Sequence, residues 1–175
     1  FGPGADPLAQ AQAVAELAGM TGEFEKPRFF RYKASLCAHG RSKITGCTQC
    51  IDVCSTAAIR ADGDHVFVEP HLCAGCGACT TVCPSGALAF AYPSVPDLAA
   101  RLKALLATYG RAGGRDACLV FHAEDGRAAL AHVARRGRGL PARALPVEVH
   151  HIASVGLDVW LAALAWGAAQ VAVVA

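Results

Sequence analysis

The sequence predicts a fold of two parts: an α+β module organised around two runs of cysteines, followed by a small α/β domain with a parallel sheet. Two observations support this prediction. Eight of the nine cysteines lie between residues 37 and 83, in two similar runs. Beyond residue 116, apolar segments of strand type alternate with helical patterns, which is typical of a parallel sheet with helices packed on it.

Length and composition limit the possibilities. The 175 residues allow one domain or two small ones, and 54% hydrophobic with 17% charged residues predicts a packed globular chain. A net charge of only +2 argues against bulk nucleic-acid binding. The odd number of cysteines favours a reducing compartment over a disulfide scaffold, so we expect a cytoplasmic protein. The chain starts with Phe1 and ends on the apolar run 171–175, and we expect a piece of a longer protein.

Residues 1–35 predict an N-terminal helix and a linker. Asp6 can cap a helix and Pro7 suits its first position, and apolar residues then recur at helical spacing as far as residue 20. We expect this helix to serve only for packing or tethering. Alternation of aromatic and basic residues over 30–33 predicts a short strand.

The second cysteine run, residues 73–84, reads C-x2-C-x2-C-x3-C-P. Three thiolates at this spacing can hold three corners of a [4Fe–4S] cluster, while Pro84 turns the fourth cysteine toward another cluster. The run therefore requires a second set, which lies upstream at Cys37, Cys47, Cys50 and Cys54. Two C-x2-C pairs could instead bind zinc, but eight cysteines in two interlocking sets favour iron and sulfur.

The two runs are also an internal repeat, since a turn of small residues and then an apolar pair follow each fourth cysteine. On these residues, the segment 36–92 resembles a bacterial-type 2[4Fe–4S] ferredoxin domain. The resemblance implies two [4Fe–4S] clusters with crossed ligands. One cluster would take Cys37, Cys47, Cys50 and Cys83, and the other would take Cys54, Cys73, Cys76 and Cys79.

The chain departs from this family at two places. Ser55 stands where the family usually has proline, and Ser tolerates a turn. The first spacing is C-x9-C instead of C-x2-C, which leaves open a three-iron cluster or His39 as the odd ligand. Cys37 is preferred because thiolate is the usual ligand at this corner. The insert also puts His39, Arg41 and Lys43 beside a cluster, which predicts either a solvated loop or a docking patch for an acidic partner.

Residues 93–175 predict the α/β domain, which we expect to be truncated. Prolines at 93 and 96 mark its boundary. The patterns predict helices over 98–110, 127–136 and 155–167, and strands over 117–121, 143–151 and 170–175. The run 155–175 could also span a bilayer, but Gly167 and Gln170 favour a helix followed by a strand.

The end of this domain weakly resembles the delta-subunit domain of methyl-viologen-reducing hydrogenase and heterodisulfide reductase systems, over residues 155–158 and 168–174. Those domains carry cysteines for a further cluster. This half of the chain has only Cys118, so the resemblance implies a similar scaffold alone.

These patterns predict an iron–sulfur electron-transfer module of a larger redox protein or complex. We expect a redox partner such as an oxidoreductase subunit, and neither nucleic-acid binding nor a membrane span. No acid, base or nucleophile constellation and no phosphate-binding glycine motif is present, so the sequence leaves open whether the chain belongs to an enzyme. The alternative is a structural or redox-sensing scaffold for the assembly or maturation of a redox enzyme.

Overall fold

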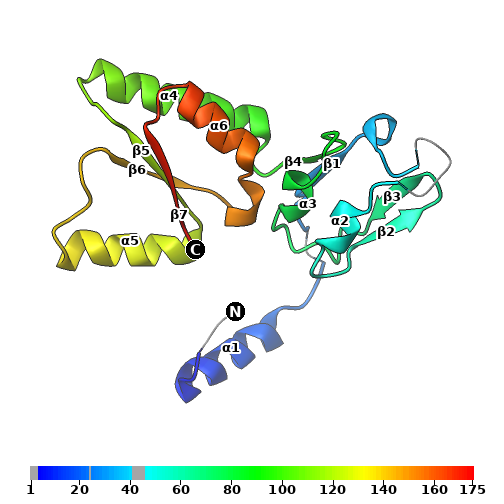
Figure 1. The fold of residues 1–175 in the computed structure, drawn as a ribbon. Coiled ribbons are helices and arrows are strands. Elements are labelled where there is room, and N and C mark those ends of the chain that lie inside the picture. Colours follow the sequence, from blue (N-terminus) through cyan, green and yellow to red (C-terminus); the bar gives the residue numbers. More distant parts are fainter. Residues whose placement is uncertain (1–3, 24, 41–45) are drawn as a thin grey trace.

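The computed structural model describes residues 4–23, 25–40 and 46–175 (Figure 1). Three parts follow one another along the chain. They are an N-terminal helix, a cysteine module (residues 29–92) and a C-terminal domain (residues 93–175).

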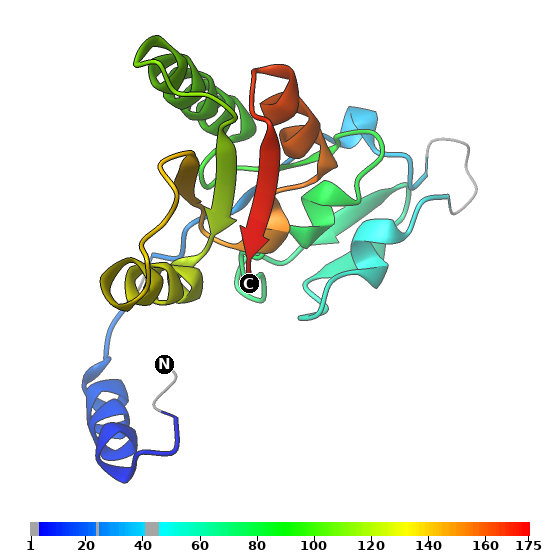
Figure 2. The ribbon, with the colours of Figure 1, turned by 60° about the vertical axis from the view of Figure 1, so that its left-hand side comes forward.

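The N-terminal helix α1 spans Pro7–Gly19, as the sequence predicts. The Asp6 carboxylate caps it by accepting a hydrogen bond from the N–H of Leu8 at 3.0 Å, and Pro7 occupies the first turn. The helix buries none of its residues, and it stands apart from the rest of the chain in both views (Figures 1 and 2). Of the two roles expected for this helix, packing is not seen among the described residues, and tethering stays a prediction.

Two short antiparallel ladders frame the cysteine module. The outer strands of the module pair with each other, with Phe30 opposite Phe90, and a hairpin that turns at Gly63 joins its halves. Each half contains a cysteine loop, a one-turn helix and a strand, which confirms the predicted repeat. The elements are β1 (Phe30–Tyr32), η1 (Ala34–Leu36), α2 (Gln49–Asp52), β2 (Ile59–Asp62), β3 (His65–Val68), α3 (Ala78–Thr81) and β4 (Leu88–Phe90).

A small apolar core fills the space between these ladders. Phe30, Val66 and Val68 are buried in it, together with Ile59 and Leu88. Several cysteines pack against the same core. The cysteine side chains are therefore set against apolar surface that limits the access of water.

The C-terminal domain is built on a three-stranded parallel sheet in the order β6-β5-β7, which confirms the predicted sheet. In Figure 1, α4 and α6 lie on one face of the sheet and α5 on the other. The elements are α4 (Val95–Arg111), β5 (Cys118–His122), α5 (Glu124–Arg136), β6 (Ala144–Glu148), η2 (Ile152–Ser154), α6 (Leu157–Ala165) and β7 (Gln170–Val174).

Local interactions set the ends of the helices in this domain. Ser94 caps α4 by accepting a hydrogen bond from the N–H of Asp97 at 3.4 Å, so the helix begins at Val95, earlier than the pattern of leucines predicts. Gly167, at φ +105°, lies between α6 and β7.

Within the described residues, no helix has both the length and the apolar character needed to cross a membrane.

The cysteine module and the C-terminal domain meet where α3 contacts η2. An added Cβ at Gly77 would lie 2.5 Å from the Cβ of Ser154, so the two backbones approach closely. Beside this contact, the ring of His150 stacks on Phe29 with centroids 4.9 Å apart and meets Tyr92 edge-on at 5.2 Å. The C-terminal domain thus packs against the segment that carries the second cysteine run.

The stability of the C-terminal domain should be most sensitive to substitutions in its central strand, β5. Phe121 is fully buried in the core between the sheet and its helices. Replacing it with alanine should lower the free energy of unfolding of this domain by about 3–5 kcal/mol, through lost burial and a cavity. Both tryptophans lie in this domain, so their emission during denaturation measures the change.

Val133, an exposed residue of α5, supplies the control. Val133→Ala should change the midpoint of unfolding little. Equal effects of the two substitutions would contradict the described packing.

Candidate metal centres

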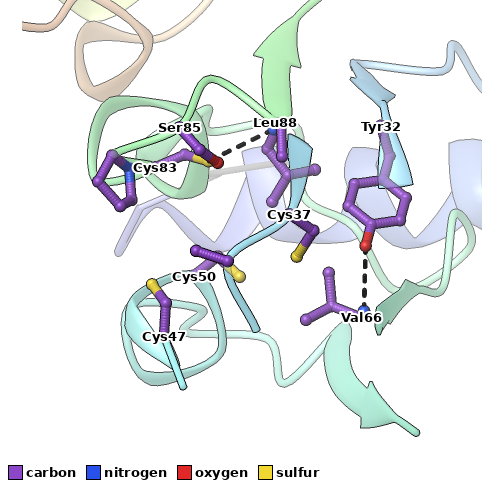
Figure 3. A pocket seen from close by; sticks show the side chains of 11 residues that line it. Tyr32, Cys37, Cys47, Cys50, Val66, Cys83, Ser85 and Leu88 are labelled. Atoms are coloured by element: carbon purple, nitrogen blue, oxygen red, sulfur yellow. Dashed lines mark hydrogen bonds between the residues drawn. The ribbon is translucent and has the colours of Figure 1, made fainter. Parts of the chain in front are cut away.

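A cavity lies in the first half of the cysteine module, and four cysteines line it (Figure 3). They are Cys37, Cys47, Cys50 and Cys83. The last of these comes from the second half of the repeat. The remaining lining includes Tyr32, Val66 and Leu88, so the sulfur atoms face a largely apolar wall.

A second cavity is related to the first by the repeat. Four cysteines line it: Cys54, Cys73, Cys76 and Cys79. Here Cys54 comes from the first half of the repeat, and the other three come from the second half. The eight cysteines therefore divide between two cavities in the two groups that the resemblance implies, and the helices α2 and α3 contact each other between them.

Glycines allow the backbone to bend closely around the second cavity. Gly75 and Gly77 have φ angles of +74° and +81°, which side chains rarely adopt. A Cβ at Gly75 would lie 2.8 Å from the ring of Phe29. Both positions therefore require glycine for two reasons, the backbone conformation and the space.

The two cysteines that cross between the halves receive hydrogen bonds from the backbone. The N–H of Ala58 donates to Cys54 Sγ at 3.3 Å, and the N–H of Leu88 donates to Cys83 Sγ at 3.5 Å. Burial raises the pKa of each thiol. Donors from Thr56 and Ala58 at Cys54, and from Leu88 and Ser85 at Cys83, outweigh burial and lower both pKa values.

One cysteine in each group instead has a raised pKa. Burial, followed by the charges of Cys83, Cys37 and Cys47, raises the pKa of Cys50 to about 11. Burial, followed by the charges of Cys73 and Cys76, raises the pKa of Cys79 to about 12. Four thiolates in one cavity repel one another, and iron cations would relieve that repulsion.

The sulfur-rich donor sets fit a [4Fe–4S] cluster, because such clusters are held by four thiolates in an apolar, hydrogen-bonded shell. Within the described residues, no three Cys, His, Asp or Glu side chains are close enough to share a single metal ion. The sulfur atoms instead surround spaces lined by many residues (Figure 3).

Three further side chains at the cavities make hydrogen bonds or close polar contacts that the sequence did not predict. The Tyr32 hydroxyl accepts a hydrogen bond from the N–H of Val66 at 3.2 Å, and burial with the nearby Cys37 raises its pKa to about 12. The hydroxyls of Thr56 and Ser85 lie 3.6 and 3.8 Å from the crossing sulfur atoms. Their shared place two residues after Cys54 and Cys83 was a signal in the repeat. Tyr32 belongs to the predicted strand over 30–33, but its hydrogen bond with Val66 had no local signal.

Apolar side chains lie at both cavities: Leu88 lines the first and Ile59 lines the second. Ile59, Leu88 and Phe90 are buried, and Val82 is half-buried. In the nine-residue insert, His39 is buried beside Cys47. Arg41 and Lys43 lie outside the described residues, so the docking patch stays a prediction.

Comparison with known proteins agrees with this geometry. Residues 45–87 match a protein family described as a 4Fe-4S dicluster domain. The chain therefore contains an iron–sulfur domain of ferredoxin type.

Particular relatives extend the comparison. The chain is 34% identical to an "Iron-sulfur protein" of Rhodospirillum rubrum over 115 residues, which is 57% of each chain. It is also 38% identical to a "Ferredoxin 7Fe" of Hydrogenibacillus schlegelii and to a "Ferredoxin" of Alicyclobacillus acidocaldarius. Each of these two matches spans 39 residues, which is 22% of this chain and 50% of the relative. The chain thus spans about half the length of these relatives. No solved structure gave a significant match.

The close approach of Gly77 to Ser154 gives a test of the contact between the domains. Gly77→Ala adds a Cβ that has no room and also forces alanine into a left-handed conformation, which costs about 1–2 kcal/mol on its own. We expect faster loss of cluster absorption on heating, together with disturbed tryptophan emission from the C-terminal domain.

Gly86 is a matched control, because its φ is +65° and nothing lies within 4 Å of an added Cβ. Gly86→Ala should therefore show the conformational cost alone. If the two variants lose their clusters equally fast, the described contact with Ser154 is wrong.

Proposed function

We propose that the chain is an electron-transfer module with two [4Fe–4S] clusters that works within a larger redox protein or complex. The observation that supports it most is the division of eight cysteines between two adjacent cavities, each with one cysteine from the other half. Two centres of this kind make a relay, since each accepts and donates one electron without breaking bonds in a substrate.

In this proposal Cys37, Cys47, Cys50 and Cys83 hold the first cluster. Cys54, Cys73, Cys76 and Cys79 hold the second cluster. The cluster supplies the electron chemistry, and the chain positions it, excludes water and donates hydrogen bonds to the sulfur atoms. The partner would be another redox protein in a reducing compartment such as the cytoplasm. The nine free thiols of the structure suit that setting.

The proposed ligand sets can be tested by iron content and by substitution. Anaerobic protein should carry about eight iron and eight sulfide ions per chain. Cys37→Ser should remove one iron from the first cluster and give a three-iron EPR signal on oxidation, because Cys47, Cys50 and Cys83 still hold three corners. Cys54→Ser should damage the second cluster instead, although this cysteine belongs to the first half.

Other outcomes would count against specific parts of the proposal. About seven iron ions in the native chain would indicate a three-iron first centre. Stoichiometric zinc would exclude both clusters. Two intact four-iron clusters in Cys37→Ser would show that another group fills that corner.

The second prediction concerns reduction potentials. A hydroxyl that donates to a cluster thiolate stabilises the more negative, reduced state, so its removal should lower the potential of the cluster it touches. Thr56→Val should lower the potential of the second cluster, and Ser85→Ala that of the first, each by about 20–60 mV.

Potentiometric titration followed by EPR separates the two clusters, and each variant serves as the control for the other. Equal shifts of both clusters in either variant would contradict the assignment. A cluster that decomposes before it accepts an electron would indicate a structural role rather than a relay.

A further inference from the structure

The nine-residue insert between Cys37 and Cys47 is closed at its base by backbone hydrogen bonds. The N–H of Gly46 donates to the carbonyl of His39 at 2.6 Å, and the N–H of Cys47 donates to the carbonyl of Ala38 at 3.3 Å. Residues 38–39 and 46–47 thus form a narrow neck, and this neck brings the two cysteines together at the first cavity.

One side chain completes the neck. His39 is only 2% exposed, and its Nδ1 lies 2.9 Å from the carbonyl oxygen of Cys47. A carbonyl can only accept, so Nδ1 must carry the proton and donate. The imidazole therefore joins the backbone just after Cys37 to the peptide of Cys47 itself.

Steric limits on two glycines hold the neck in place. A Cβ at Gly46 would lie 2.6 Å from the carbonyl oxygen of Ala38, so a larger residue would push the two sides apart. A Cβ at Gly40 would lie 2.2 Å from the Cα of Asp64, at the turn of the β2–β3 hairpin. The two sides of the neck thus contact each other at Gly46 and Ala38, and the neck packs against the β2–β3 hairpin at Gly40.

We propose that His39 is a positioning residue for the first iron–sulfur site, which donates from Nδ1 to the Cys47 carbonyl and so keeps Cys37 and Cys47 at adjoining corners of one cluster. The inference rests on the ligand set proposed above and assigns His39 a role other than iron ligand. It explains how a C-x9-C spacing can serve a site that usually has C-x2-C.

Three substitutions distinguish the roles of the two ring nitrogens. Asn places an amide N–H close to the position of Nδ1, Gln places one near Nε2, and Leu keeps the volume without any donor. Loss of the bond leaves a buried carbonyl unpaired, and we expect about tenfold faster loss of one iron from the first cluster. The readouts are iron content and the three-iron EPR signal during controlled exposure to air.

His39→Leu and His39→Gln should lose this iron about tenfold faster than the native chain, and His39→Asn should stay within about twofold of it. The second cluster should be unchanged in all three. Gly46→Ala should cause the same faster iron loss as His39→Leu, because it pushes apart the other side of the neck. Gly110→Ala is its control, since nothing lies within 4 Å of a Cβ there and its backbone, like that of Gly46, is outside the left-handed region.

Several results would overturn the proposal. Native behaviour of His39→Leu would show that the bond is dispensable. If His39→Gln keeps the iron of the first cluster and His39→Asn loses it, the role belongs to Nε2. If all three variants lose this iron, His39 is favoured as an iron ligand. Loss of both clusters in His39→Leu would show a general effect on folding.

Cys37→Ser, measured in parallel, separates this inference from the proposed function. If Cys37→Ser gives the three-iron signal while His39→Leu does not, only the role of His39 fails. If Cys37→Ser keeps two four-iron clusters, the ligand set itself is wrong.

Discussion

The mutual repulsion of four thiolates in one apolar cavity is the constraint on which the rest of the cysteine module depends. Burial and neighbouring sulfur atoms raise the pKa of Cys50 and of Cys79, so the fully ionised form of either group of four is unfavourable without cations. The hydrogen bonds at Cys54 and Cys83 offset part of this cost. Each cavity draws one cysteine from the other half, so with the proposed ligand sets neither half would complete a site alone, and metal binding would be coupled to folding of the whole module.

Much of the fold could be predicted from the sequence, because the decisive signals are local. The resemblance to a ferredoxin domain, which rests on the cysteine runs, implied the grouping of sulfur atoms that the two cavities show. The alternation of strand-type and helical segments indicated the parallel sheet of the C-terminal part. Boundaries were less accurate: α4 begins at Val95 rather than near Leu98, since its start depends on the Ser94 cap and not on the leucine pattern.

The parts that could not be predicted involve contacts between distant residues. Nothing near Gly77 in the sequence indicates that Ser154 will pack against it. The position of Tyr32 beside Cys37 depends on the pairing of β1 with β4, which brings the strand to the cavity. For His39 the sequence offered an iron ligand or a loop residue, and the bond to a backbone carbonyl became visible only with the neck closed.

The contact of η2 with α3 has a consequence for the symmetry of the molecule. A duplicated module alone has two interchangeable ends, through which electrons could enter or leave equally well. The C-terminal domain lies against α3, which carries Cys79, so the two ends have different surroundings. In a relay of the proposed kind, the cluster beside α3 would border the rest of the same chain, so the two clusters would differ in environment although the module that holds them is a repeat.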